Sequence, residues 1–255
     1  MKECLFYIGA DTPATRYAKA FLESWGCPFT DSPSDAVSHL LLNVPTFSDQ
    51  GKLVGGSDLE AILCKLPSRV TVIGGKLNVP LLQNYSTWDL LQNEAYLAEN
   101  AAITADCALR VAYAHFPAVL TGTTVLILGW GRIAKCLARL LRAVGANVTV
   151  SARKEADLAM AHALGYDTVG LHAIGPHLPR YRILFNTVPA MILPEALLRQ
   201  AKSNCLKIEL ASVPGIAGSD VISARGLPGK LAPESSGRLI AKTILDLCRQ
   251  KEVIP

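Results

Sequence analysis

Residues 125–154, VLILGWGRIAKCLARLLRAVGANVTVSARK, decide the fold of this 255-residue chain. Four apolar residues, 125–128, are typical of a strand buried on both faces. A G-x-G-x-x-A turn follows at residues 129–134, and apolar residues spaced three or four apart then predict a helix that ends at Gly145. Residues 148–150 are a second predicted strand. The segment is therefore one βαβ unit with a dinucleotide-binding fingerprint between its first strand and its helix.

Each position of the fingerprint has a physical role in binding a dinucleotide. Gly129 permits the tight turn, Gly131 lets the backbone approach a pyrophosphate, and Ala134 lets the helix pack close to the strand. The N–H groups at the start of the helix are suited to bind phosphate. A tight turn without a ligand is the alternative, and the flanking strand, helix and strand favour nucleotide binding. We expect cofactor contacts from five consecutive residues: Gly129, Trp130, Gly131, Arg132 and Ile133.

The end of the second strand predicts which dinucleotide binds. An NAD site places a carboxylate there to accept hydrogen bonds from the ribose 2′-hydroxyl, but this chain has Ser151, followed by Arg153 and Lys154. The nearest acids, Glu155 and Asp157, fall in the next predicted helix. A hydroxyl and two cations suit a 2′-phosphate, so we expect NADP as the cofactor. The alternative is that Arg153 is a surface residue at the start of a helix.

Composition excludes several other classes of protein. Half of the residues are hydrophobic and the net charge is +4, with no basic run that would indicate a nucleic-acid partner. The seven cysteines have no C-x-x-C spacing and the five histidines form no ligand spacing, so we expect neither disulfides nor a metal. Apolar residues 5–8 are too few for a signal peptide, and no apolar run is long enough to span a membrane. We therefore expect a cytoplasmic protein.

The alternation of predicted strands and helices indicates two α/β domains. Residues 1–99 are expected to form a smaller N-terminal α/β domain on the substrate side, completed by a C-terminal helix over residues 233–250. Its elements include a helix whose N-cap is Ser57. Residues 100–255 are expected to form a Rossmann domain with a doubly wound parallel sheet, entered through a short strand at 96–98 and a helix at 102–115.

Further motifs resemble those of one family, the A subunit of bacterial dipicolinate synthase. They are G-W-G-R at 129–132, A-R at 152–153, N-T-V-P at 186–189, L-A-S-V-P-G at 210–215, G-L-P-G at 226–229 and A-P…G at 232–237. The resemblance implies an NADP-dependent oxidoreductase that works with a flavoprotein-like B subunit in dipicolinic acid biosynthesis during sporulation. The implied product is pyridine-2,6-dicarboxylate, made from a cyclic lysine-pathway intermediate, 4-hydroxy-tetrahydrodipicolinate or dihydrodipicolinate. The overall plan is also similar to that of D-2-hydroxyacid dehydrogenases, although no histidine follows His177 to act as their late acid/base.

The chemistry needed to remove a hydride beside a nicotinamide suggests which residues form the remainder of the site. We expect Thr187, Val188, Pro189 and Ala211 to form the wall beside the nicotinamide, and Pro233 to begin a helix whose N-terminus binds an anion. The candidate catalytic residues are Asp106, Thr104 and Ser212. Two alternatives are that Asp106 stabilises a helix macrodipole and that the Ser212 hydroxyl caps its own turn.

Four departures from the family pattern bear on the substrate. Val213 replaces a basic residue, Glu234 stands where a lysine is usual, and Asp106 replaces a glutamate. Residues 214–224 form a shorter segment than in the family, so the nucleotide sheet could lack a strand. These departures suggest two other functions, a catalytically idle NADP-binding partner protein or a different small-molecule dehydrogenase. A homo-oligomer is the expected assembly.

Overall fold

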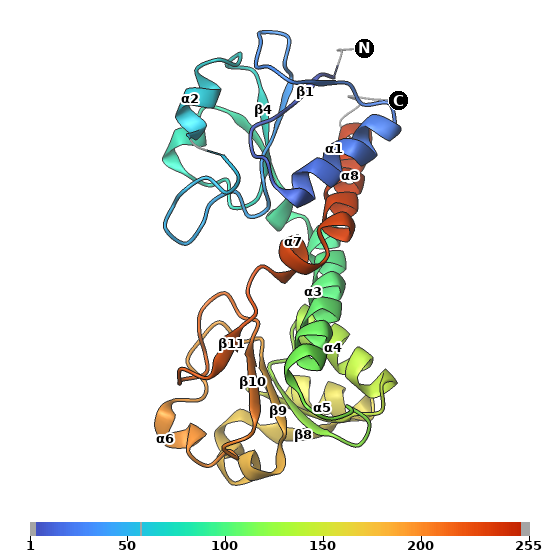
Figure 1. The fold of residues 1–255 in the computed structure, drawn as a ribbon, viewed down its shortest axis with the longest axis vertical. Coiled ribbons are helices and arrows are strands. Elements are labelled where there is room, and N and C mark those ends of the chain that lie inside the picture. The colour runs from blue at the N-terminus through green and yellow to red at the C-terminus, as the bar shows by residue number, and fades with distance from the viewer. Residues whose placement is uncertain (1–3, 57, 251–255) are drawn as a thin grey trace. The chain divides into compact units, whose positions relative to one another are not determined.

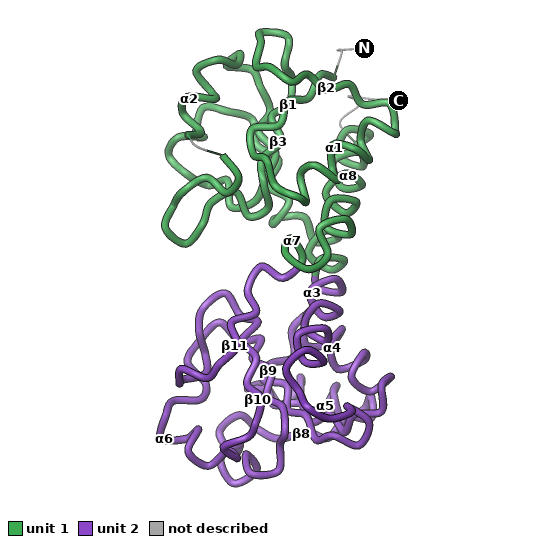
Figure 2. Tube along the Cα trace, viewed as in Figure 1, with its two compact units in different colours: residues 1–100, 228–255 green, residues 101–227 purple. Residues whose placement is uncertain are grey.

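The structure is a computed structural model that describes residues 4–56 and 58–250. The chain divides into two compact units, which are coloured separately in Figure 2. Unit 1 consists of Met1–Asn100 and Pro228–Pro255, and unit 2 consists of Ala101–Leu227. Each unit is built around its own parallel sheet.

Unit 2 contains a six-stranded sheet in the order β11-β10-β9-β6-β7-β8. All of its strand pairs are parallel. The chain starts at β6 in the centre, builds outward through β7 and β8, and then returns to build β9, β10 and β11 on the other side of β6. This is the strand order of a doubly wound Rossmann sheet. The strands are β6 (Thr124–Leu128), β7 (Asn147–Ala152), β8 (Asp167–Gly170), β9 (Ile183–Asn186), β10 (Leu206–Glu209) and β11 (Val221–Ser223).

Burial explains why the central strands form where they do. Val125–Leu128 and all four residues of β9 are buried, as expected for strands covered on both faces. Helix α4 (Arg132–Ala143) buries Ala134, Leu137, Ala138 and Leu141, which lie on one face of the helix. It packs on β6 and β7, while α5 (Glu155–Ala163) packs on β7 and β8 (Figure 1). Shorter helical segments are η3 (Leu171–Ala173), η4 (Gly175–Arg180) and α6 (Glu195–Leu198).

Unit 1 contains a five-stranded parallel sheet in the order β2-β1-β3-β4-β5. Its core combines β3 and β4 with helix α2, through residues such as Leu40, Val72 and Leu63. Helix α1 (Pro13–Ser24) starts at a Thr12 capping box, and Pro13 is its first residue. The other elements are β1 (Phe6–Ile8), β2 (Phe29–Thr30), β3 (His39–Leu41), α2 (Leu59–Leu63), β4 (Thr71–Gly74), η1 (Pro80–Leu82), β5 (Ser86–Asp89) and η2 (Leu90–Gln92).

The last part of the chain returns to unit 1. After the short helix α7 (Leu227–Leu231), helix α8 (Pro233–Gln250) packs along α1. The two helices approach closely at Gly237, where an added Cβ would lie 2.6 Å from the carbonyl oxygen of Ala14 and 2.8 Å from the nitrogen of Ala18. The absence of a side chain at Gly237 therefore sets how closely α8 packs on α1.

Three expectations for individual elements need correction. Residues 96–98 are not a strand, because helix α3 (Glu94–His115) already begins at Glu94 and buries Tyr96. The nucleotide sheet does not lack a strand, because Val221–Ser223 pairs with β10 inside the shortened segment. Ser57 lies outside the described residues, and the N-cap of α2 is Asp58, whose carboxylate accepts a hydrogen bond from Glu60 N at 2.9 Å.

Replacing Gly237 by alanine tests the α1–α8 packing. We expect Gly237→Ala to lower the free energy of unfolding by about 1–2 kcal/mol, because overpacking against backbone atoms outweighs the better helix propensity of alanine. Gly229→Ala is the control, since Gly229 lies in α7 and an added Cβ there would meet nothing within 4 Å. Denaturant unfolding measures both variants, and equal midpoints for the two would contradict this account of the packing.

Candidate nucleotide-binding site

The register of the unit 2 sheet places the ends of four strands side by side. Leu128 at the end of β6 pairs with Ser151 of β7 on one side and with Asn186 of β9 on the other. Asn186 in turn pairs with Glu209 of β10. The winding of the sheet reverses between β6 and β9, and doubly wound sheets bind ligands outside the carboxyl ends of their strands at that point. The loops after residues 128, 152, 186 and 209 are therefore the candidate site.

Gly129 is required by the fold itself. Its φ is +102°, a conformation that residues with a side chain rarely adopt, and its N–H donates to the carbonyl of Ser151 at 2.7 Å. An added Cβ would lie 2.5 Å from Oγ1 of Thr187. That hydroxyl donates to the carbonyl oxygen of Leu128 at 2.8 Å. Gly129 thus lets the loop after β9 lie directly against the fingerprint turn.

Gly131 differs, because nothing in the fold requires a glycine there. Its φ of −79° is open to any residue, and an added Cβ would meet nothing within 4 Å. Gly131 is the N-cap of α4 and offers no side chain to cap its first N–H groups. An open space beside the backbone at the start of a twelve-residue helix is what a pyrophosphate group needs. The residues present therefore fit a dinucleotide.

The other fingerprint residues have different surroundings. Trp130 is buried, and its ring packs edge-on against Tyr166 with the ring centroids 5.6 Å apart. Trp130 can therefore offer a ligand its backbone more readily than its side chain. Arg132 is exposed, Ile133 is half-buried, and Ala134 is buried under the sheet.

The end of β7 carries exposed cations. Ser151 is 0% exposed and its Oγ has no hydrogen-bond partner among the described residues, so the predicted hydroxyl contact with a phosphate does not fit this side chain. Arg153 and Lys154 follow it and are both exposed. Glu155 and Asp157 stand in the first turn of α5, where acids favour the helix macrodipole. The two residues that directly follow the strand are therefore cationic, and the acids belong to the helix after them.

The loops after β9 and β10 are joined by a buried acid that no sequence motif predicted. Glu209 is 3% exposed, and its Oε1 accepts hydrogen bonds from Asn186 Nδ2 at 2.8 Å and Ala211 N at 3.0 Å. Its Oε2 accepts from Gly215 N at 2.7 Å and from Ile216 N at 3.2 Å. A charged residue in the otherwise buried end of β10 was the signal in the sequence.

Of the residues expected to line the nicotinamide wall, Thr187 and Val188 are half-buried, Pro189 is exposed, and Ala211 is buried. Thr187 and Val188 lie next to the fingerprint turn, since both would contact a Cβ at Gly129. Ala211 is linked to the loop of Thr187 through Glu209 and Asn186. The structure thus brings these residues together at one edge of the sheet.

The candidate catalytic residues are less closely connected. Asp106 is half exposed on α3 and forms an ion pair with Arg110 at 3.3 Å. Because α3 begins at Glu94, Asp106 is well beyond its first turn and the macrodipole alternative does not apply. Thr104 is buried, and Ser212 is exposed in the loop after β10. Pro233 begins α8 in unit 1. The roles of these four residues stay predictions.

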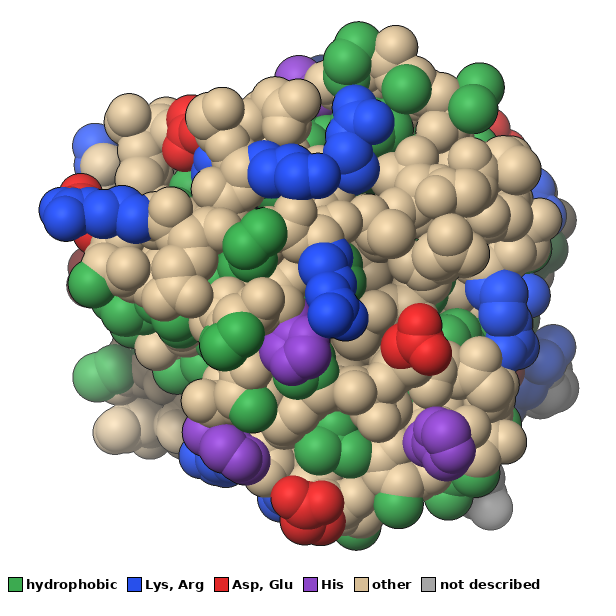
Figure 3. Space-filling model, turned by 90° about the horizontal axis from the view of Figure 1, so that it is seen from below, with side chains coloured by type: hydrophobic (Ala, Val, Ile, Leu, Met, Phe, Trp, Pro, Cys, Tyr) green, Lys and Arg blue, Asp and Glu red, His purple; other side chains and the backbone are tan. Residues whose placement is uncertain are grey.

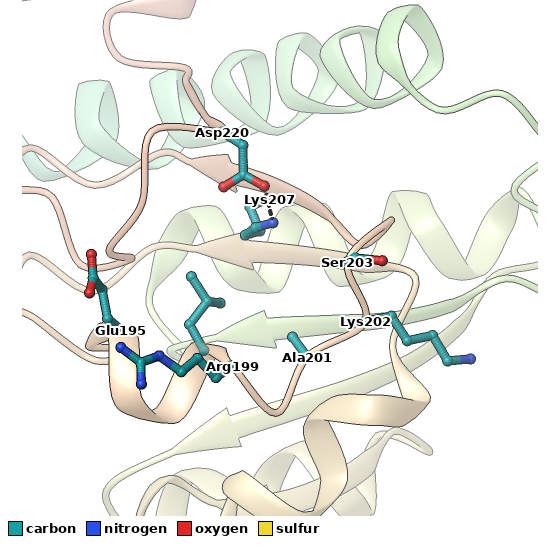
Figure 4. Close-up of a pocket in the computed structure, with 8 residues that line it drawn as sticks. Glu195, Arg199, Ala201, Lys202, Ser203, Lys207 and Asp220 are labelled. Carbon is teal, nitrogen blue, oxygen red and sulfur yellow. Dashed lines mark hydrogen bonds and ion pairs between the residues drawn. The ribbon is translucent and has the colours of Figure 1, made fainter.

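A cavity of about 410 Å³ lies elsewhere, beside the first residues of β10 (Figure 4). Its charged lining is mixed, with Glu195 and Asp220 as well as Arg199, Lys202 and Lys207. Nζ of Lys207 donates to Asp220 at 2.5 Å and to the carbonyl of Cys205 at 3.2 Å, while the Lys202 side chain points away from that pair. This cavity is at the opposite end of β10 from the loop that Glu209 organises.

Neither surface charge nor the placement of possible metal ligands indicates another site in the described residues. Lys and Arg side chains on the face in Figure 3 are interspersed with acidic, histidine and hydrophobic ones. Among residues 4–56 and 58–250, no group of three or more His, Cys, Asp or Glu side chains could hold a metal ion. In the same part of the chain, no helix is both long and apolar enough to cross a membrane.

Comparison with known proteins supports the resemblance seen in the motifs. No family model matches the chain. The dipicolinate synthase A subunit of Bacillus subtilis (strain 168) is 26% identical over 241 residues, which cover 87% of this chain and 81% of the relative. The crystal structure of the dipicolinate synthase A subunit from Bacillus halodurans has a TM-score of 0.82 and 23% identity, covering 96% of this chain and 98% of that one.

A transhydrogenase from Sinorhizobium meliloti has a TM-score of 0.72 at 12% identity, covering 97% of this chain and 94% of that one. Further structural neighbours at lower TM-scores are dehydrogenases. The predicted resemblance to the A subunit of dipicolinate synthase is therefore confirmed, as is the predicted α/β Rossmann-like fold. The fold is dehydrogenase-like.

The contrast between the two glycines of the fingerprint yields a prediction. We expect the free energy of unfolding of Gly131→Ala to stay within about 0.5 kcal/mol of that of the unmodified chain, because the added Cβ enters open space. The same variant should bind a dinucleotide about tenfold or more weakly. Gly129→Ala should instead lower stability by about 1–3 kcal/mol, because of its positive φ and the contact with Thr187. Thermal unfolding and titration with NADPH and NADH measure both effects. Unchanged affinity in Gly131→Ala would show that the open space is not a ligand site.

Proposed function

We propose that this chain is the NADP-binding component of an oxidoreductase of the dipicolinate synthase type. It would form pyridine-2,6-dicarboxylate from a cyclic lysine-pathway intermediate, either 4-hydroxy-tetrahydrodipicolinate, by loss of water, a hydride and a proton, or dihydrodipicolinate, by loss of a hydride and a proton. The observation that carries this proposal is the open space beside Gly131 at the start of α4. Nothing in the fold itself requires a glycine at this position. The 26% identity with the A subunit of dipicolinate synthase supports the reaction and substrate class.

The adenosine half of the cofactor is assigned to the loops after β6 and β7. The N–H groups at the start of α4 bind the pyrophosphate, and the Gly131 backbone allows its close approach. The exposed guanidinium of Arg153 would hold the 2′-phosphate, and the ammonium of Lys154 would add a second positive charge. The buried Ser151 side chain takes no part in this contact.

The nicotinamide half is assigned to the loops after β9 and β10. A bound nicotinamide cofactor supplies the hydride acceptor for the reaction. Thr187, Val188, Pro189 and Ala211 form the wall that orients the ring and excludes water from one side. The Asp106 carboxylate accepts a proton from the substrate, while the hydroxyls of Thr104 and Ser212 donate hydrogen bonds that orient it.

The substrate and partners follow from the same resemblance. A dicarboxylate needs cations or a helix N-terminus to replace its lost water, and Pro233 at the start of α8 supplies one such N-terminus. We assign Arg225, a basic residue of unit 2, to compensate for the charge that is lost at Val213. The active assembly combines this chain, as a homo-oligomer, with a flavoprotein-like B subunit in the cytoplasm.

A second function is favoured by one observation. Val213 is 50% exposed and uncharged in the loop after β10, at the position where the family pattern has a basic residue. A catalytically idle NADP-binding protein would tolerate this loss. Assay of the chain with a flavoprotein-like B subunit plus the cyclic intermediate separates the two functions. Growth of the absorbance of a pyridine dicarboxylate supports the first, tight NADPH binding without turnover supports the second, and turnover of a different substrate alone would indicate another dehydrogenase.

The charge at the end of β7 predicts cofactor preference. We expect NADPH to bind about ten to a hundred times more tightly than NADH, because charge-assisted contacts to the 2′-phosphate would contribute about 1.5–3 kcal/mol in all. Arg153→Ala should remove most of this preference and leave NADH affinity nearly unchanged. Lys154→Ala is the matched control, with a smaller effect expected. Fluorescence titration of both cofactors measures the preference, and equal or tighter binding of NADH by the unmodified chain would refute it.

The role of Asp106 is tested in the same assay. We expect Asp106→Asn to lower kcat about a hundredfold, the usual contribution of general acid–base catalysis, and to leave NADPH affinity unchanged. The competing explanation is that Asp106 only pairs with Arg110 on the surface of α3. Arg110→Gln breaks the same ion pair and should keep nearly full turnover. If both variants have the same activity as the unmodified chain, Asp106 is a surface residue.

A further inference from the structure

The carboxylate of Glu209 is the most fully bonded side chain at the candidate site. It is 3% exposed, and each of its oxygens accepts two hydrogen bonds. All four donors are neutral N–H groups, three from the backbone and one from the amide of Asn186. An ionised carboxylate has about four acceptor positions, so these bonds satisfy it without a cation. Such an arrangement holds its donors in fixed positions, because leaving any of them unpaired in a buried place is costly.

The four donors come from two different loops. Asn186 ends β9, whereas Ala211, Gly215 and Ile216 lie in the segment after β10. The carboxylate therefore fixes the spacing between the loop after β9 and the loop after β10. None of the four donors comes from the fingerprint turn or from the end of β7.

A chain of hydrogen bonds connects Glu209 to the expected nicotinamide wall. The Asn186 amide that donates to Glu209 also donates to the carbonyl of Val188 at 2.9 Å, and its Oδ1 accepts from Val188 N at 3.0 Å. Thr187, the residue between them, is held on Leu128 through its backbone N–H at 3.0 Å and its hydroxyl at 2.8 Å. Displacing Glu209 would thus move Val188 and Ala211 relative to the fixed end of β6.

We propose that Glu209 is a positioning residue for the nicotinamide half of the cofactor site. Its carboxylate holds the loop of Thr187 and Val188 and the loop of Ala211 at the separation that the nicotinamide ring requires. This inference rests on the proposed function. It adds that the hydrogen bonds of Glu209 reach only the loops after β9 and β10, so that the nicotinamide half can be disturbed while Thr187 still holds the fingerprint turn through Leu128.

Glu209→Gln tests the proposal with a side chain of the same shape. The glutamine amide has one oxygen and one NH₂ group. Its NH₂ group must therefore face N–H groups whose hydrogen bonds a Glu209 oxygen now accepts. Adenosine 2′,5′-bisphosphate probes the adenosine half alone, and NADPH probes both halves. We expect NADPH affinity to fall about tenfold or more and bisphosphate affinity to change less than about twofold. The change in nicotinamide fluorescence on binding should also diminish.

Lys207→Met is the matched control, because Lys207 is a second buried, hydrogen-bonded charge in β10, at the end away from the loops. Lys207→Met should leave the ratio of the affinities for NADPH and for the bisphosphate unchanged. If Glu209→Gln lowers both affinities in parallel, or if Lys207→Met produces the same split, Glu209 is only structural and the proposal is wrong. If the unmodified chain binds NADPH and Glu209→Gln binds it equally well, the proposal is also wrong while the proposed function stands.

An unmodified chain that binds neither NADPH nor NADH overturns the proposed function instead, together with this inference. Should Glu209→Gln not fold, Asn186→Ser gives a second test. It removes the side-chain link between the two loops and leaves the three backbone donors to Glu209 in place. The same loss of NADPH affinity with retained bisphosphate affinity supports the proposal, and a parallel loss of both contradicts it.

Discussion

Two hydrogen bonds from Thr187 to the carbonyl of Leu128 connect the first half of the nucleotide sheet to the second. They bring the loop after β9 so close to the fingerprint turn that only a glycine fits at position 129. From this contact the remaining order of the site follows, since Asn186 adjoins Thr187 and Glu209 bonds to Asn186. The close approach of the two loops thus defines the site, and the side chains of Asn186 and Glu209 then hold the neighbouring loop in place.

Much of this arrangement could be predicted from sequence, because it depends on local patterns. The buried strand, the glycine turn and the amphipathic helix at residues 124–143 each have a distinct period or turn residue. Parallel pairing then places the ends of strands at one edge, which is why Thr187 and Val188 could be assigned to the same site as Gly129. In these elements the determining interactions lie close in the chain, and the sequence pattern and the structure agree.

The features that were not predicted correctly from the sequence depend on interactions without a local pattern. The segment 96–98 is apolar throughout but too short for its pattern to distinguish a strand from a helix, and the burial of Tyr96 within α3 is a tertiary effect. The edge strand β11 has only three residues, which is too short for a periodic pattern. Glu209 bonds mostly to backbone N–H groups, which have no signature in the sequence. Ser151 occupies the expected strand end, but sequence alone does not report which way its side chain points.

The return of the chain to unit 1 has a consequence for the order of folding during synthesis. Unit 2 is continuous in sequence, so all of its strands are available once residue 227 has left the ribosome. Unit 1 leaves the ribosome first but lacks α8, which covers α1 and follows unit 2 in the chain. The usual order, in which the N-terminal domain is completed first, is therefore reversed. Until α8 has been made, α1 lacks the helix that packs along it, so a chain interrupted after residue 227 has a complete unit 2 and an incomplete unit 1.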